Sequence, residues 1–211
     1  MRFLLLLLCA GASAQSGLDC LVDGLGGADR LDAVRELVLD ATTDARLAGR
    51  DTGTRTRVAI RPDETVWTVG PGARRGQTTR AARDSVRLGG GAGALTGEPA
   101  RRVRQAAWLH PAVLALRRAE VEAAEGSCDG VLQVTVPDFP EPLVIQLDES
   151  GRPLLLSTFR QRGAERVYLS VQYRDYRETD GVWVPRQMTL AEGGVQTGRT
   201  RITGVTVRDR P

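Results

Sequence analysis

Residues 173–190 read YRDYRETDGVWVPRQMTL, and this stretch decides the fold class. Aromatic and charged side chains alternate before Asp180-Gly181, and a stiff Val-Trp-Val run follows the glycine. Glycine readily takes the positive φ of a tight turn, while β-branched and aromatic residues favour strands. The pattern therefore predicts an antiparallel hairpin in which Tyr173 and Met188 lie in one sheet. Pro185 has no N–H for a sheet ladder, so we expect it at an edge or a bulge.

Segments on both sides of this hairpin show the same alternation. Apolar residues recur at every second position, which is typical of strands with one buried and one solvated face. The expected strands, of which 77–88 has the weakest pattern, are 37–41, 55–61, 65–69, 77–88, 132–136, 143–147, 153–159, 167–177 and 197–207. The short connections between them favour a meander of antiparallel neighbours.

Three helices are expected between these strands. Apolar residues at helical spacing predict a helix over 30–38, with Asp29 as its cap. Proline suits the first helical position, which predicts helices over 99–108 and 112–118. The glycine-rich stretch 89–97 is interpreted as a flexible loop, because a phosphate-binding loop needs a lysine that the chain lacks.

The first 14 residues have the pattern of a secretory signal peptide. Arg2 supplies the positive start, 3–8 is an apolar run, and 12–14 are small residues suited to cleavage. We therefore expect a soluble mature chain of residues 15–211 that forms a single domain. Acylation of Cys9 is an alternative, but three leucines precede it where a small residue is expected.

Cleavage at this point leaves two cysteines, Cys20 and Cys128. Cysteines of an exported protein pair by default, because the compartment is oxidising. The sequence therefore predicts a disulfide that closes a loop of about 100 residues, a restraint worth roughly 4 to 5 kcal/mol in the chain-entropy account.

Composition argues against a nucleic-acid-binding function. All 29 basic residues are arginine and no lysine or asparagine is present, which a GC-rich genome would produce. The signs of charge are interspersed along the chain, so no basic stripe predicts a nucleic-acid partner. With 41% hydrophobic residues the chain has enough apolar side chains for one sizeable core.

No catalytic motif or metal-binding pattern is found. The single histidine, His110, would have to serve any Ser/His or Cys/His arrangement, and Gly-x-Ser-x-Gly is missing. Glu120, Glu122 and Glu125 cluster without histidine or cysteine, which is more typical of a solvated helix end than of a metal site. We therefore expect no enzyme activity and no cofactor, although a spatially assembled carboxylate pair stays an alternative.

Several segments together resemble the LolA/LolB-type outer-membrane lipoprotein-sorting superfamily. The strongest is the hairpin stretch 173–185, and the resemblance extends over 26–209. The resemblance also rests on Gly26-Gly27, Arg61-Pro62, Leu109-His110-Pro111 and the last strand. The resemblance implies an α+β fold, a strongly curved antiparallel sheet or half-open β-barrel with helices covering an apolar concave side that takes acyl chains. The glycine-rich stretch 89–99 departs from the strand pair expected there.

The resemblance also implies a site, a location and partners. Candidate residues for lining the hydrophobic concavity are Trp67, Trp108, Leu155, Tyr173 and Trp183. Arg55 and Arg57 could anchor a lid or a head group, but alternating strand arginines more often lie on a solvated face. We expect a periplasmic, monomeric carrier of acyl lipids or lipoproteins, with a membrane-associated protein as a further candidate partner. The alternative is a periplasmic interaction module whose concavity its own side chains fill.

Overall fold

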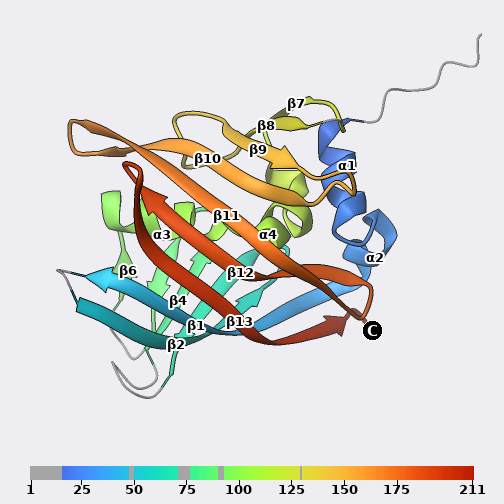
Figure 1. The fold of residues 1–211 in the computed structure, drawn as a ribbon. Helices are drawn as coiled ribbons and strands as arrows, with labels where there is room; N and C mark the ends of the chain where they lie inside the picture. The colour runs from blue at the N-terminus through green and yellow to red at the C-terminus, as the bar shows by residue number, and fades with distance from the viewer. Residues whose placement is uncertain (1–15, 48–49, 71–76, 90–92, 129) are drawn as a thin grey trace, which may run out of the picture.

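The computed structural model describes residues 16–47, 50–70, 77–89, 93–128 and 130–211. One antiparallel sheet of thirteen strands runs in the order β6-β5-β4-β3-β2-β1-β13-β12-β11-β10-β9-β8-β7 and does not close on itself. The sheet curves around the helices α3 and α4, which lie between its β1–β6 part and its β7–β10 part (Figure 1). The predicted α+β class with a strongly curved antiparallel sheet is confirmed.

The strands of the N-terminal half form consecutive antiparallel pairs from β1 to β6. They are β1 Val34–Leu47, β2 Arg50–Ile60, β3 Glu64–Val69, β4 Thr78–Ala82, β5 Val86–Leu88 and β6 Ala94–Leu95. The expected strand 77–88 is thus two strands joined by a turn, and the expected loop 89–97 contains the short edge strand β6.

The C-terminal half repeats this meander from β7 to β13. Its strands are β7 Ala123–Gly126, β8 Val131–Thr135, β9 Leu143–Leu147, β10 Pro153–Arg162, β11 Glu165–Thr179, β12 Val182–Glu192 and β13 Val195–Asp209. β13 pairs with β1, so the first and last strands are neighbours in the middle of the sheet.

The hairpin predicted at residues 173–190 is confirmed. Tyr173 of β11 pairs with Met188 of β12, and Asp180 and Gly181 form the turn with φ of 48° and 75°. β12 is an interior strand of the sheet, but at Pro185 it is paired only with β11, so the proline lies at a local edge as expected. The ladder between β12 and β13 begins only at Gln187, so the missing N–H of Pro185 interrupts no bond to β13.

The helices follow the prediction except near the N-terminus. They are α1 Gly17–Gly24, α2 Ala28–Ala33, α3 Gly97–Trp108 and α4 Pro111–Leu116, followed by the 3-10 turn Arg118–Glu120. The helix expected over 30–38 is wrong in its second half, because Val34 already begins β1 opposite Asp209. Strand pairing to the C-terminal strand overrides the helical spacing of the valines there. Asp29 lies in the first turn of α2, whose N-cap is Gly27.

α1 was not anticipated from sequence, although its start carries a capping box. The Ser16 hydroxyl accepts from the Asp19 N–H, while the Asp19 carboxylate accepts from the Ser16 N–H. The predicted disulfide is present: Cys20 of α1 is bonded to Cys128, with 5.5 Å between the two Cα atoms. α1 also packs closely on the turn between β9 and β10, where a Cβ on Gly24 would lie 2.5 Å from the Gly151 backbone.

One large hydrophobic core extends along the concave side from β7–β12 to inward residues of β1, β2 and β13. Every residue of α4 is buried; α4 contacts α2 and α3 and shares the core with inward residues of the sheet such as Leu132, Ile145 and Leu156. A smaller cluster of Ala81, Val86 and Ala100 attaches α3 to β4 and β5. Members of the large cluster, among them Leu39, Ile60 and Ile202, also border the cavity described next.

Candidate apolar binding cavity

A cavity of about 190 Å³ lies between the concave face of the central strands and the helices α3 and α4. Its wall consists of Leu39, Ala41, Thr43, Thr56, Val58, Ile60, Thr65, Trp67, Ala106, Ala107, His110, Val113, Met188, Thr200 and Ile202. Aspartate, glutamate and arginine are missing from this described wall. The cavity therefore suits an apolar ligand.

Strand alternation builds the sheet side of this wall. Leu39, Ala41 and Thr43 are every second residue of β1, and residues 56, 58 and 60 of β2 continue the same face. The intervening residues Asp40 and Arg57 point to the opposite face, where they form an ion pair. The alternation that predicts these strands thus also separates an apolar inner face from a charged outer face.

α3 and α4 cover the cavity from the other side. Ala106 and Ala107 at the end of α3 present small side chains, which leave space that larger residues would fill. The Arg104 guanidinium lies 2.6 Å from the Asp138 carboxylate, and this ion pair ties α3 to the loop after β8. The cavity volume of about 190 Å³ is smaller than the roughly 300 Å³ at which ligand pockets usually begin. It is larger than the roughly 150 Å³ apolar cavity that admits benzene.

Two buried polar atoms on the wall have no hydrogen-bond partner among the described residues: Nε2 of His110 and the hydroxyl of Thr65. Nδ1 of His110 accepts from the Ala112 N–H at 3.2 Å, so His110 caps α4 and a neutral ring carries its proton on Nε2. Burial lowers the pKa of His110 from 6.5 to about 4, so the ring is neutral at pH 7. The cavity therefore contains an uncharged N–H donor in an apolar wall.

Of the five candidate residues for the concavity, Trp67 of β3 lines this cavity. Trp108 is 1% exposed, belongs to the core, and has the Arg117 guanidinium 4.8 Å from its ring. Tyr173 is also 1% exposed, and its hydroxyl donates a 2.7 Å hydrogen bond to the Leu109 carbonyl. Burial raises the pKa of the Tyr173 phenol well above its ordinary value. Both Trp108 and Tyr173 support the helices beside the cavity without lining it.

The other two candidates lie elsewhere on the sheet. Trp183 lies at the end of α1, where its backbone N–H donates to the Leu25 carbonyl and the Arg152 guanidinium lies 3.7 Å from its ring. Leu155 is half-buried and pairs with Gln146 and Gln172, two exposed residues of the neighbouring strands. Sequence reasoning overlooked His110 and Met188 as wall residues; Met188 could have been found from its pairing with the inward Tyr173.

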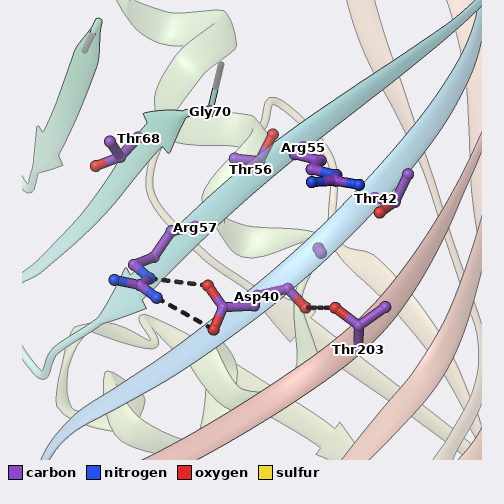
Figure 2. A pocket seen from close by; sticks show the side chains of 9 residues that line it. Asp40, Thr42, Arg55, Thr56, Arg57, Thr68, Gly70 and Thr203 are labelled. Atoms are coloured by element: carbon purple, nitrogen blue, oxygen red, sulfur yellow. Dashed lines mark hydrogen bonds and ion pairs between the residues drawn. The ribbon is translucent and has the colours of Figure 1, made fainter. Parts of the chain in front are cut away.

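The opposite face of the same strands carries a second, polar hollow of about 530 Å³ (Figure 2). Arg57 donates to Asp40 at 2.8 Å, and the Thr203 hydroxyl donates to the Asp40 carbonyl at 3.1 Å. Arg55 lines the hollow beside them. Arg57 and Asp40 are 63% and 48% exposed, so water competes for their charges and the hollow has little to hold an apolar ligand.

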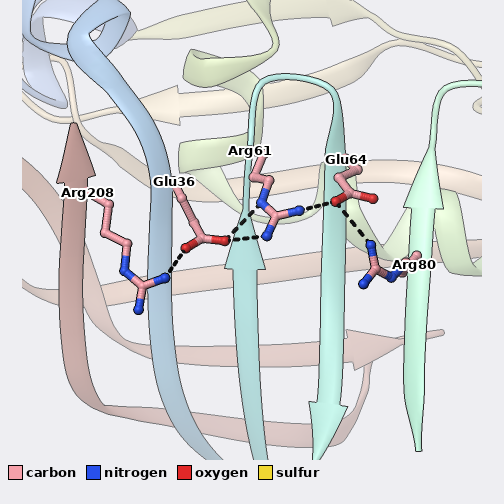
Figure 3. A network of polar contacts seen from close by, with 5 residues as sticks. All are labelled: Glu36, Arg61, Glu64, Arg80 and Arg208. Atoms are coloured by element: carbon pink, nitrogen blue, oxygen red, sulfur yellow. Dashed lines mark hydrogen bonds and ion pairs between the residues drawn. The ribbon is translucent and has the colours of Figure 1, made fainter. Parts of the chain in front are cut away.

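A chain of ion pairs crosses the sheet near the start of β1 (Figure 3). The carboxylate of Glu36, 6% exposed, lies 2.7 Å from Arg61 and 2.6 Å from Arg208, and Arg61 also contacts Glu64. Burial raises the pKa of Glu36, but hydrogen bonds and the charges of Arg61 and Arg208 outweigh it, so the net pKa lies below its ordinary value. The network is a structural tie between β1, β2 and β13.

The described helices include no span long and apolar enough to cross a membrane. Within the same described part of the chain, no group of three or more histidine, cysteine, aspartate or glutamate side chains could hold a metal ion. Glu120, of the predicted acidic cluster, is paired with Arg117 at 2.8 Å, while Glu125 lies in β7. The expected signal peptide and Cys9 lie outside the described residues.

Comparison with known proteins finds similarity in structure. No protein-family model and no curated protein matches the sequence. A LolA superfamily protein from Nitrosomonas europaea superposes with a TM-score of 0.60 at 14% identity, covering 94% of this chain and 96% of the other. A putative outer membrane lipoprotein-sorting protein domain from Vibrio parahaemolyticus gives 0.58 at 13% identity, with 82% and 85% covered.

A DUF1329 family protein from Desulfovibrio piger gives a TM-score of 0.62 at 11% identity, with 90% and 91% of the two chains covered. At these sequence identities the comparisons establish the fold but not the activity. The activity is inferred below from the chemistry of the cavity. The resemblance inferred from the hairpin stretch is confirmed at the level of structure. The chain has the open, curved-sheet fold of LolA superfamily structures.

Proposed function

We propose that the protein binds and carries the acyl chain of a lipid or lipoprotein in the cavity beneath α3 and α4. The observation that carries this proposal is the uncharged, mostly apolar wall on the concave side, formed by the same strands whose outer face is charged. Similarity of fold to proteins described as lipoprotein-sorting or LolA superfamily members supports it.

The setting of this function is part of the proposal. A cleaved signal peptide at 1–14 would deliver residues 15–211 to the periplasm as one monomeric domain, and the disulfide between Cys20 and Cys128 suits an oxidising compartment. The partners would be an acyl lipid or lipoprotein and a membrane-associated protein that exchanges it. We propose no catalysis, because the single histidine accepts a hydrogen bond as the cap of α4 and its ring is neutral.

The second candidate is an interaction module that binds no small ligand. It is favoured by the burial of Trp108, Tyr173 and all of α4 in the large core on the concave side. The two candidates differ in what the cavity contains after purification, because a carrier retains lipid and a module does not.

Native mass spectrometry of the mature protein, followed by lipid extraction, tests the choice. A carrier gives adducts whose mass matches a lipid and which dissociate on activation. The matched control is Ala106→Trp, which places an indole at the exposed rim of the cavity, where it narrows the entrance. Loss of adducts in this folded variant would locate the lipid; adducts that persist unchanged would move it elsewhere, and no adducts in either protein would favour the interaction module.

A further inference from the structure

The wall of the cavity is apolar except for threonine hydroxyl groups and His110. Only some of these polar groups have a hydrogen-bond partner. The hydroxyls of Thr43 and Thr200 lie 3.0 Å apart and satisfy each other. Nε2 of His110 and the hydroxyl of Thr65 lie on the same wall, are buried, and have no partner among the described residues. A buried donor without an acceptor costs about 1 to 3 kcal/mol, so a ligand that brings an acceptor gains affinity there.

The acceptor must be uncharged. Ionised carboxylates and phosphates lose much hydration energy in an apolar cavity unless a cation compensates. The described wall has no arginine, and His110 cannot supply a positive charge at neutral pH because its ring is neutral. Carbonyl oxygens of esters and amides accept a hydrogen bond at a far smaller desolvation cost.

We propose that the cavity selects chains bearing an uncharged ester or amide carbonyl, whose oxygen accepts a hydrogen bond from Nε2 of His110. Thr65 supplies a second donor on the same wall. This inference rests on the proposed function, and it makes His110 a specificity-determining residue that distinguishes an acylated head group from a free fatty acid. The hydrocarbon chain would occupy the apolar remainder around Trp67, Val58 and Met188.

Two substitutions of His110 separate the helix-capping role of Nδ1 from the donor role of Nε2. His110→Asn keeps an oxygen near the position of Nδ1, which caps α4, but its short side chain loses the donor at Nε2. His110→Gln keeps a nitrogen donor near Nε2 and loses the cap. Thr65→Val removes the second hydroxyl with little change of shape.

The test measures displacement of a fluorescent long-chain dye at pH 7 by methyl octanoate and by decane, in the native protein and in each variant. The affinity ratio of ester to hydrocarbon should fall about tenfold in His110→Asn and stay within about twofold in His110→Gln, because one neutral hydrogen bond is worth about that factor. Comparing ratios cancels losses of stability common to both probes. An equal ratio in the folded native protein, His110→Asn and His110→Gln would overturn the carbonyl contact while leaving a chain-binding function intact.

A measurement on the native protein covers the case in which His110→Asn fails to fold. Methyl octanoate should bind at least about tenfold more tightly than octanoate ion at pH 7, since the ion is buried without a cation. Equal affinities, or tighter binding of the ion, would overturn selection of an uncharged head. If neither probe nor dye binds the folded protein, the proposed function itself fails together with this inference.

Discussion

Tyr173 of β11 and Leu109, between α3 and α4, are joined by a 2.7 Å hydrogen bond from the phenol to the backbone carbonyl. The bond connects the hairpin that decides the fold to the two helices that cover the cavity. Tyr173 is 1% exposed, so water cannot replace the phenol if it is removed. The residue is therefore a buried support for the cavity's cover.

Tyr173→Phe should lower the free energy of unfolding by about 1 to 2 kcal/mol, because the Leu109 carbonyl loses a buried donor. Urea denaturation measures the change. Tyr168→Phe serves as the control: Tyr168 is 39% exposed and should change stability by less than about 0.5 kcal/mol. Equal effects of the two substitutions would mean that the hydrogen bond contributes nothing of its own.

Loss of the disulfide should be the largest single stability change. Replacing Cys20 and Cys128 together by serine removes a restraint over 108 residues of sequence. The unfolding free energy should fall by roughly 4 kcal/mol, since a loop near that size restricts the unfolded chain strongly. Thiol titration of the denatured, unreduced mature protein should first find neither cysteine reactive, and two reactive thiols would refute the bond.

His110 should make the protein less stable as pH falls from 6.5 towards 4. The unfolded ring takes up a proton near its ordinary pKa of 6.5, whereas the buried ring does so only at about 4. The unfolded state therefore binds more protons in this window, and stability is full above it and declines through it. His110→Gln should flatten the decline in chemical denaturation across this range. The same slope in both proteins would contradict a buried, neutral ring.

Glu36 should cause a further loss of stability in more acidic solution than His110 does. The pKa of its carboxyl is below the ordinary 4.5 in the folded protein, so its stabilisation is present above pH 4.5 and is lost as pH falls through the folded value. Glu36→Gln should lower the free energy of unfolding by about 1 to 2 kcal/mol at pH 7, because it removes the charge that pairs with Arg61 and Arg208. The loss stays moderate because both arginines are partly exposed and recover hydration. The cost should vanish in strong acid; exposed Glu178→Gln, as control, should cost little at any pH.

The sequence predicted the sheet well, because its strands alternate strictly and its hairpin turn carries Asp180-Gly181. It failed at α2, where the valines from Val34 onward have helical spacing but pair with the last strand. Such pairing between residues 34 and 209 depends on contacts that local patterns do not contain. α1 was missed although Ser16 and Asp19 form its capping box.

The site was harder to predict than the fold. Large aromatic residues were natural candidates, yet Trp108 and Tyr173 fill the core and only Trp67 of the five lines the cavity. A cavity arises where small side chains such as Ala106 and Ala107 leave space, and alternation identifies the inner face without showing where that face is left uncovered. His110 was assessed as a catalytic residue, and its place on the wall follows from the fold.

Trp67 and Trp183 provide a matched pair for locating the ligand. Trp67→Ala should weaken binding of a long-chain dye by about tenfold or more, because the ring forms part of the cavity wall. Trp183→Ala should lower stability and leave dye affinity nearly unchanged, since Trp183 packs against Arg152 and the end of α1. Equal losses of dye affinity in the two folded variants would show that the dye does not occupy this cavity.

Affinity as a function of chain length tests the central claim, that the cavity binds an acyl chain, most directly. Methyl esters of 6 to about 14 carbons, in steps of two, would be titrated against the native protein and Ala106→Trp by calorimetry. Each buried methylene is worth roughly 0.8 kcal/mol, so affinity should rise about tenfold per step until the cavity is full, and the plateau should come at a shorter chain in Ala106→Trp. Affinity that is independent of chain length, or identical in the two proteins, would contradict the account.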